Sequence, residues 1–164
     1  FFVDEAHGFG LYSIGGLCCH LGLVDDVDFI MTTLSKSTAS IGGVVATSPE
    51  FVSLLQLEAN PYLFQAALTP PDAAAVIASL DVIESNPGIV QSLWDKTRYF
   101  RGELKRLGFD IGSGTSPIIP LYIRDSETLL AMGREMQEMG IFTTSVAYPV
   151  VKHTEVRFRF ILNK

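Results

Sequence analysis

Two short polar clusters in this chain combine side chains that can do chemistry, and each cluster follows an apolar segment. The first, Asp4-Glu5-Ala6-His7, comes directly after Phe1-Phe2-Val3. The second is a group of hydroxyl residues that leads to Lys36 and comes after Phe29-Ile30-Met31. Carboxylate, imidazole and amine groups can hold charge, transfer protons and, in the case of the amine, form a covalent bond with a carbonyl carbon.

Lys36 stands between two segments that the pattern predicts to be strands. Thr32, Thr33 and Ser35 precede it, small residues follow it, and Gly42-Gly43 opens a second apolar strand over residues 43–46. Burial between two such strands would lower the pKa of the lysine, and a neutral amine can form a Schiff base. The neighbouring hydroxyls could donate to a phosphate. The alternative is a surface lysine in a loop rich in serine and threonine.

The elements that must position these side chains are the strands at 1–3 and 29–31. Open α/β sheets bind their ligands at the carboxyl ends of the strands. Polar residues follow the carboxyl end of both segments, and the pattern therefore indicates an α/β fold with a crevice shared by the two strand ends.

The motifs that carry these residues resemble one enzyme family when they are taken together. They are VDEAHGFG, VDFIMTTLSKS, GGVVATS, PYLFQAALTPP, SPIIPLYI, VAYPVV and VRFRF. In this combination the chain resembles the α-oxoamine synthases, which include 8-amino-7-oxononanoate synthase, 2-amino-3-ketobutyrate CoA ligase, 5-aminolevulinate synthase and serine palmitoyltransferase. The resemblance implies a fold-type I transferase that depends on pyridoxal 5′-phosphate (PLP), represented here by part of its large-domain sheet and a smaller α+β C-terminal domain.

The resemblance also implies a role for each candidate residue. Asp4 would hold the proton on the ring nitrogen of PLP, and His7 would bind the phenolic oxygen of the ring. Lys36 would form the Schiff base and, once released, move the proton. Thr33 would contact the phosphate. Arg159 would bind the substrate carboxylate.

The implied reaction condenses an amino acid with an acyl thioester of coenzyme A or a carrier protein. Decarboxylation then gives an α-amino ketone. Because active sites of this family form between two subunits and use residues from both halves of the chain, we expect a cytoplasmic homodimer and no activity from these 164 residues alone. The resemblance places an N-terminal half before Phe1 and a last helix after Lys164.

Two departures from the family pattern weaken the assignment. Relatives carry a Gly-Arg-Gly where this chain reads Gly16-Leu17-Cys18. The serine or threonine residues that reach the phosphate from a neighbouring subunit are replaced by Gln65, Ala66 and Ala67, which would move that contact, for instance to Thr69. A non-catalytic subunit of the same family, or another fold-type I enzyme such as an aminotransferase, is therefore an alternative.

A third reading comes from a different class of protein. Asp-Glu-Ala-His after an apolar strand is also the Walker B text of DEAH-type ATPases, in which the aspartate holds Mg²⁺ and the glutamate orients water. Such ATPases need a Gly-x-x-x-x-Gly-Lys-Ser/Thr loop, which is absent from residues 1–164. The Thr-Leu-Ser-Lys text around Lys36 also favours the PLP reading.

Composition narrows the class of protein further. The chain is 48% hydrophobic with a formal net charge of −6, which predicts a packed core and argues against nucleic acid as a partner. No apolar run is long enough to span a membrane. The adjacent Cys18 and Cys19 are expected to be reduced thiols, and with His20 they lack the usual spacing of metal ligands. We therefore expect no metal.

Hydrophobic periodicity divides the chain into two regions. Residues 1–86 are assigned to the PLP-binding large domain, with helices at 49–57 and 71–85. Residues 87–164 are assigned to the small α+β domain, incomplete at its C-terminus, with a helix at 87–107 and another from a cap at Ser126 to Met139. Strands are expected at 109–111, 117–123, 141–146 and 156–162. On the last strand the alternation places Arg157 and Arg159 on the face away from the core.

Overall fold

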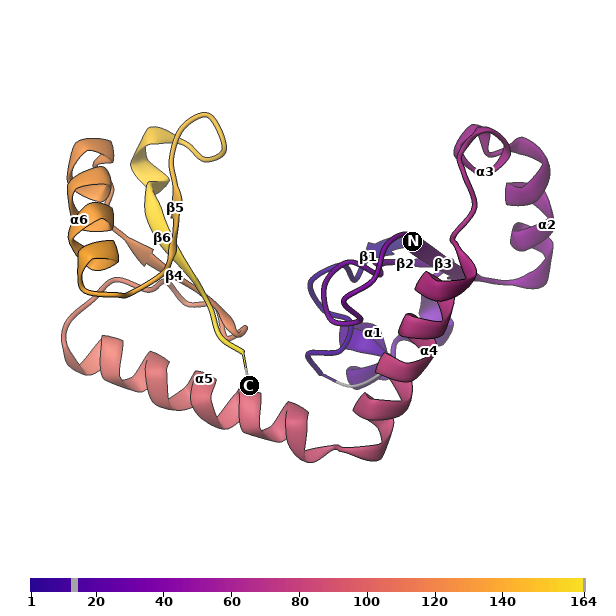
Figure 1. The fold of residues 1–164 in the computed structure, drawn as a ribbon, viewed down its shortest axis with the longest axis horizontal. Coiled ribbons are helices and arrows are strands. Elements are labelled where there is room, and N and C mark those ends of the chain that lie inside the picture. Colours follow the sequence, from indigo (N-terminus) through magenta and orange to yellow (C-terminus); the bar gives the residue numbers. More distant parts are fainter. Residues whose placement is uncertain (13–14, 164) are drawn as a thin grey trace. The chain divides into compact units, whose positions relative to one another are not determined.

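A computed structural model describes residues 1–12 and 15–163 of the chain (Figure 1). It divides into two compact units, Phe1–Val90 and Gln91–Lys164, with the division close to the start of one long helix. Each unit has its own three-stranded sheet. The two are described separately below.

The sheet of the first unit places the two polar clusters side by side. Its strands are β1 (Phe2–Asp4), β2 (Phe29–Thr33) and β3 (Gly43–Thr47), in the order β1-β2-β3. β1 and β2 run parallel, and β3 is antiparallel to β2. The Lys36 loop joins β2 to β3, as the sequence predicts. However, most of β3 is exposed, because it forms an edge of the sheet.

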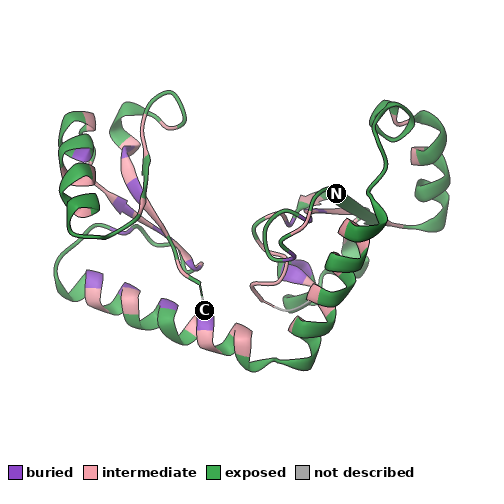
Figure 2. Ribbon diagram, in the orientation of Figure 1, coloured by how far each residue is buried: buried purple, intermediate pink, exposed green. Residues whose placement is uncertain are grey.

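Helices and one 3₁₀ turn complete the first unit. They are α1 (Gly16–His20), η1 (Val24–Asp26), α2 (Pro49–Glu58), α3 (Asn60–Phe64) and α4 (Pro70–Ser85). Ser48 occupies the N-cap position of α2 but makes no capping hydrogen bond. Helix α2 ends within one residue of the predicted limit at 57, and a further short helix, α3, begins at Asn60. Neither α2 nor α3 contains a buried residue, and Figure 2 shows most of their length in green, the colour of exposed residues.

Helix α5 (Gly88–Arg106) carries the chain into the second unit and buries one face. Its buried residues are Leu93, Thr97, Arg101 and Leu104, at the three- and four-residue spacing of a single helical face. Gly108 follows the helix with φ +84°, a left-handed conformation that glycine adopts without strain. The predicted end of this helix is therefore confirmed.

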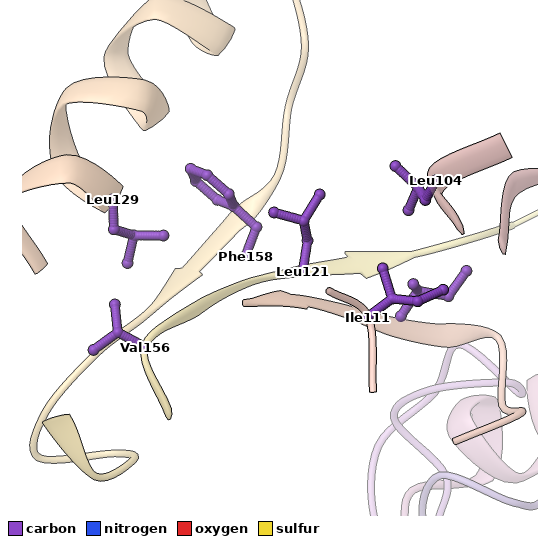
Figure 3. Packing of buried hydrophobic residues seen from close by; sticks show 7 residues of the cluster. Leu104, Ile111, Leu121, Leu129, Val156 and Phe158 are labelled. Carbon is purple, nitrogen blue, oxygen red and sulfur yellow. The ribbon is translucent and has the colours of Figure 1, made fainter. Parts of the chain in front are cut away.

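The second unit is an antiparallel sheet packed against helices. β4 (Ile118–Tyr122), β6 (Arg157–Ile161) and β5 (Thr144–Val146) lie in that order, accompanied by α6 (Ser126–Glu138) and η2 (His153–Glu155). The core is the cluster drawn in Figure 3: Leu104, Ile111, Ile119, Leu121, Leu129, Val156 and Phe158. Val156 and Phe158 face this core, so the predicted alternation of the last strand is confirmed.

Three local predictions in the second unit are wrong. Residues 109–111 form no strand, although Ile111 is buried in the core. β5 covers only Thr144–Val146 of the expected 141–146. Asp125, and not Ser126, caps α6, because its carboxylate accepts a hydrogen bond from the Thr128 backbone N–H at 2.7 Å. Apolar side chains are a poor guide to strands where burial comes from a loop that crosses a core.

Within the described residues no single helix is long and apolar enough to cross a membrane; only α4 and α5 together have the length and composition of a span.

Candidate active site

The carboxyl ends of β1 and β2 lie next to each other. Parallel pairing sets Asp4 opposite Met31, and the Glu5 backbone N–H donates to the Met31 carbonyl at 2.7 Å. The Thr32 hydroxyl donates to the Glu5 carbonyl at 3.3 Å. The two polar clusters found in the sequence therefore leave the sheet at one edge and side by side, as predicted.

Asp4 and His7 belong to a tight turn that begins at the end of β1. The Asp4 carboxylate accepts a hydrogen bond from the Ala6 backbone N–H at 2.8 Å, and the Glu5 carbonyl accepts from the N–H groups of Gly8 and Phe9, each at 2.8 Å. Asp4 and His7 are both exposed. The turn thus presents a carboxylate and an imidazole at the edge of the sheet.

Two hydroxyls meet at the end of β2. The oxygens of Thr33 and Ser35 are 2.8 Å apart, and the Thr33 hydroxyl also lies 3.3 Å from both the Ser35 backbone nitrogen and the Gly42 carbonyl oxygen. Thr33 is half-buried and Ser35 is exposed. This pair can donate hydrogen bonds to a phosphate without large rearrangement, because both oxygens are already held by local contacts.

Lys36 is exposed in the loop that follows, and its Nζ makes no hydrogen bond or ion pair with the described residues. The expectation that two strands bury it is therefore wrong for residues 1–164. The reason is geometric, since Lys36 lies beyond the last paired residue of β2 and its loop extends past the edge of the sheet.

The backbone around Lys36 is nevertheless held firmly. The buried Thr38 hydroxyl donates to the Leu34 carbonyl at 2.8 Å. Helix α4 fastens the far side of the loop, because Ser79 donates to the Thr38 carbonyl at 3.0 Å and Ser40 donates to the Asp72 carbonyl at 2.9 Å. Ala39 has φ +48°, a left-handed conformation that is costly for a residue with a side chain. These hydrogen bonds hold that strained residue in place.

The segment after His7 lies against the Lys36 loop. A Cβ atom added to Gly10, whose φ is +79°, would lie 2.7 Å from the Ser37 Cβ, closer than two carbon atoms can approach. Only glycine fits at position 10 in this arrangement. The backbone of Gly10 therefore packs against the Ser37 side chain, one residue away from Lys36.

The segment that departs from the family pattern offers no replacement hydroxyl in the described structure. Gln65, Ala66 and Ala67 are exposed and link α3 to α4. The Thr69 hydroxyl is engaged at the start of α4, where it donates to the Asp72 carboxylate and accepts from the Asp72 backbone N–H at 3.4 Å. Because the Thr69 hydroxyl already caps α4, it is engaged in hydrogen bonds within its own chain.

The two arginines of β6 differ sharply in their partners. Arg157 donates to the Tyr122 hydroxyl at 3.1 Å and lies over its ring, 5.3 Å from the centroid. Arg159 is half-buried, its Nε is inaccessible and has no hydrogen-bond partner, and no described acidic side chain pairs with it. A charged donor buried in this way is costly until it meets an acceptor. Arg159 therefore differs from Arg157 in having a buried Nε donor without an acceptor.

Sequence reasoning missed the residue that joins these parts of the first unit. Glu5 was weighed only as a water-orienting group in the ATPase reading, yet its side chain is 3% exposed and accepts from the Cys18 backbone N–H at 2.6 Å. The available signal was a carboxylate next to two glycines, Gly8 and Gly16, that leave space for it. Among the described residues, no group of three or more His, Cys, Asp or Glu side chains could hold a metal ion.

Residues 1–163 match the family model described as aminotransferase class I and II. The chain is 37% identical over 163 residues to the 8-amino-7-oxononanoate synthase of Fervidobacterium nodosum, with 98% of this chain and 41% of that protein covered. It is 38% identical over 162 residues to the serine palmitoyltransferase of Bacteroides thetaiotaomicron, again with 98% and 41% covered. The chain thus spans about two fifths of the length of these relatives.

Solved structures agree with these matches. The serine palmitoyltransferase of Sphingomonas wittichii superimposes with a TM-score of 0.90 at 28% identity, covering 99% of this chain and 42% of that one. A serine palmitoyltransferase from S. paucimobilis, solved with PLP and myriocin bound, gives the same TM-score, identity and coverage. The 8-amino-7-oxononanoate synthase of Francisella tularensis shares the fold, with a TM-score of 0.87 at 22% identity.

The chain belongs to the class I and II aminotransferase family. The predicted fold-type I architecture is confirmed, and so is the resemblance to α-oxoamine synthases, since relatives in both comparisons carry those names. This membership is inconsistent with the ATPase alternative, as is the burial of Glu5, which leaves no water-facing carboxylate at that position.

Proposed function

We propose that this chain is the C-terminal part of a PLP-dependent α-oxoamine synthase that condenses an amino acid with an acyl thioester and releases carbon dioxide. The observation that carries the proposal is the parallel pairing of β1 with β2, which sets Asp4 opposite Met31, on the strand that leads to Thr33 and Lys36. The names of the relatives support the same reaction class.

The chemistry of these side chains fits PLP. A carboxylate suits a protonated ring nitrogen, a pair of hydroxyls suits a phosphate, and an amine without a partner suits an aldehyde carbon. When bound, PLP supplies an electron sink for the negative charge that develops at the amino-acid α-carbon. Binding the cofactor, orienting the amino acid and moving the proton would be done by protein side chains.

Asp4 would stabilise a proton on the ring nitrogen of bound PLP. Its turn is fixed by the Ala6 N–H contact, which sets the direction of the carboxylate. His7, on the same turn, would donate to the ring oxygen. Thr33 would hold the phosphate together with Ser35, whose hydroxyl it contacts. Lys36 would supply the amine that holds the cofactor and would move the α-proton, for which its exposed position in a firmly held loop is suited.

Arg159 binds the carboxylate of the amino acid. A planar guanidinium can grip a carboxylate through two parallel hydrogen bonds, which also fixes the direction of the bonds around the α-carbon. Arg157 is already held by Tyr122, whereas the buried Nε of Arg159 is without an acceptor. This difference supports Arg159 over Arg157.

The finer assignments extend the same proposal. Residues 1–86 would be the end of the PLP-binding domain and residues 87–164 the small domain. The acyl donor would be a thioester of coenzyme A or a carrier protein, and the enzyme would act as a cytoplasmic homodimer. Numerous large apolar side chains are exposed in the first unit, among them Phe51, Leu57, Leu63 and Phe64, which supports further contacts and inactivity of residues 1–164 alone.

The decisive experiment combines cofactor trapping with an assay of the products. The full-length protein, incubated with PLP, should gain visible absorbance, and borohydride should attach the cofactor to the Lys36 peptide and not to those of Lys96 or Lys152. Glycine, alanine or serine with acyl-CoA should then release free thiol and carbon dioxide in equal amounts. Label on another lysine would refute the site.

The product assay separates the remaining alternatives. Amino exchange that depends on a keto acid, without release of thiol, would identify an aminotransferase. Trapping on Lys36 without any turnover would identify a non-catalytic subunit, which the absence of hydroxyls at Gln65, Ala66 and Ala67 makes a specific competitor.

A further inference from the structure

The Glu5 carboxylate is buried at the junction of three segments of the first unit. Its side chain is 3% exposed, and its Oε1 accepts from the backbone N–H of Cys18, in α1, at 2.6 Å. Its backbone N–H and carbonyl bind β2, through Met31 and Thr32. One residue therefore fastens β1, β2 and α1 together, directly beside Asp4 and two residues before His7.

Two glycines make room for this carboxylate. A Cβ on Gly8 would lie 1.8 Å from Oε2 of Glu5, and a Cβ on Gly16, whose φ is +72°, would lie 2.9 Å from the same oxygen. Neither position could carry a side chain while Glu5 keeps its place. The carboxylate is thus enclosed by backbone on both sides and cannot face a substrate.

The Cys18 thiol is the third contact. The side chain is buried, and its pKa is raised by that burial, by its hydrogen bond to Glu5 and by the negative charge of Glu5. The thiol therefore stays protonated and donates to the carboxylate. A backbone N–H and a thiol from the same residue both stabilise the charge of Glu5.

We propose that Glu5 is a positioning residue that locks α1 onto the turn carrying Asp4 and His7, and thereby sets these two side chains for the cofactor. The effect of Glu5 on the cofactor rests on the proposed function, because the positions of Asp4 and His7 matter only if PLP binds there. The lock itself is independent of PLP. Glu5 acts through its neighbours and touches neither the cofactor nor the substrate.

The first arm of the test measures the lock without PLP. In full-length apoprotein carrying Cys19→Ser, which removes the exposed neighbouring thiol, the rate of Cys18 modification by a disulfide reagent is compared with and without Glu5→Gln. Glu5→Gln removes the negative charge that helps to raise the pKa of the Cys18 thiol, and it loosens the lock. Because the thiolate is the reacting form, the rate of Cys18 modification should rise about tenfold. Glu84→Gln, a neutralised exposed glutamate of α4, is the matched control and should leave the rate unchanged.

The second arm measures the consequence for the cofactor. Glu5→Gln should weaken PLP binding by about fivefold to tenfold, the effect of losing one good polar contact, and should move the pH midpoint of the visible absorbance, which Glu84→Gln should not. A purely structural glutamate would lower the melting temperature and leave the pH midpoint in place. That outcome, or an unchanged Cys18 rate, overturns the proposal.

A double-variant cycle protects the test against misfolding. Gly8→Ala should disturb Cys18 reactivity while Glu5 is present and should add little in the Glu5→Ala background, because the added methyl group then has space. If the Glu5 variants do not fold, Gly8→Ala alone decides, and an unchanged Cys18 rate in that variant rejects the lock. If the wild type binds no PLP, the proposed function fails while the thiol arm still tests the lock.

Discussion

Gly10 packs against the side chain of Ser37, so that a Cβ atom on Gly10 would lie only 2.7 Å from the Ser37 Cβ. This contact joins the segment after His7 to the loop of Lys36. It connects the two halves of the proposed site through positions that carry no catalytic group. The site thus depends on a close approach that a single methyl group would disrupt.

The first prediction follows from this contact. Gly10→Ala should cost about 1–2 kcal/mol from the left-handed backbone alone, and the overlap with Ser37 should further displace the Lys36 loop and weaken PLP binding in the full-length protein. Gly22→Ala is the matched control, because Gly22 has φ +70° but nothing within 4 Å of its added Cβ. Equal PLP affinity in the two variants, measured by absorbance titration, would show that the contact has no bearing on the site.

Arg159→Lys keeps a positive charge but loses the planar fork, so it should raise the KM for the amino acid about tenfold or more while leaving PLP binding intact. Arg157→Lys is the control from the same face of β6. This variant should mainly lose the hydrogen bond and the ring contact with Tyr122. The measurement is steady-state kinetics with varied amino acid. The opposite pattern, with the KM effect in Arg157→Lys only, would move the assignment to Arg157.

Thr33→Val removes a hydroxyl without changing the shape of the side chain. A hydrogen bond to a charged phosphate contributes about 1.5–3 kcal/mol, so the dissociation constant of PLP should rise by about tenfold or more. Thr47→Val provides a comparison on β3, where the hydroxyl donates to the Asp28 carbonyl at 2.6 Å at the other end of the sheet. Unchanged PLP affinity in Thr33→Val would remove this residue from the phosphate contact.

Leu129→Ala should destabilise the protein by about 2–5 kcal/mol, because the side chain is fully buried in the core of the second unit and its removal leaves a cavity. Leu130→Ala is the neighbouring control, since Leu130 is 57% exposed and should cost far less. Chemical denaturation of the full-length protein measures both. Similar losses in the two variants would mean that the register of α6 against the sheet is wrong.

The ion pair between Asp110 and Arg124 predicts a specific response to acid. The hydrogen bond from Arg124, aided by the Gly112 backbone N–H, lowers the pKa of the Asp110 carboxyl below its usual value. The stabilisation is therefore present above the unfolded carboxyl pKa of about 4 and is lost as the pH falls through the lower folded value. The difference in melting temperature between wild type and Asp110→Asn should be constant near neutral pH and vanish in acid. A difference that persists at the lowest pH would exclude the pair as its cause.

Local patterns in the sequence were sufficient for much of the fold. The apolar runs before Asp4 and before Lys36 predicted β1 and β2, and proline and glycine signals predicted the limits of α2, α4 and α5 closely. These features are encoded by neighbours in the chain, through side-chain periodicity and the backbone preferences of glycine and proline. The types of the chemical groups can also be read from the sequence, and the resemblance of their motifs to a known family implied the class of cofactor.

Only the tertiary structure decided which side chains are buried and which groups they bind, because both depend on segments that are distant in the chain. Lys36 proved exposed, since its loop extends past the sheet edge, whereas Glu5 proved buried, since α1 and two glycines close over it. Alternation placed Arg157 and Arg159 on one face but could not separate them. Tyr122, from β4, occupies Arg157 and leaves the buried Nε of Arg159 without an acceptor.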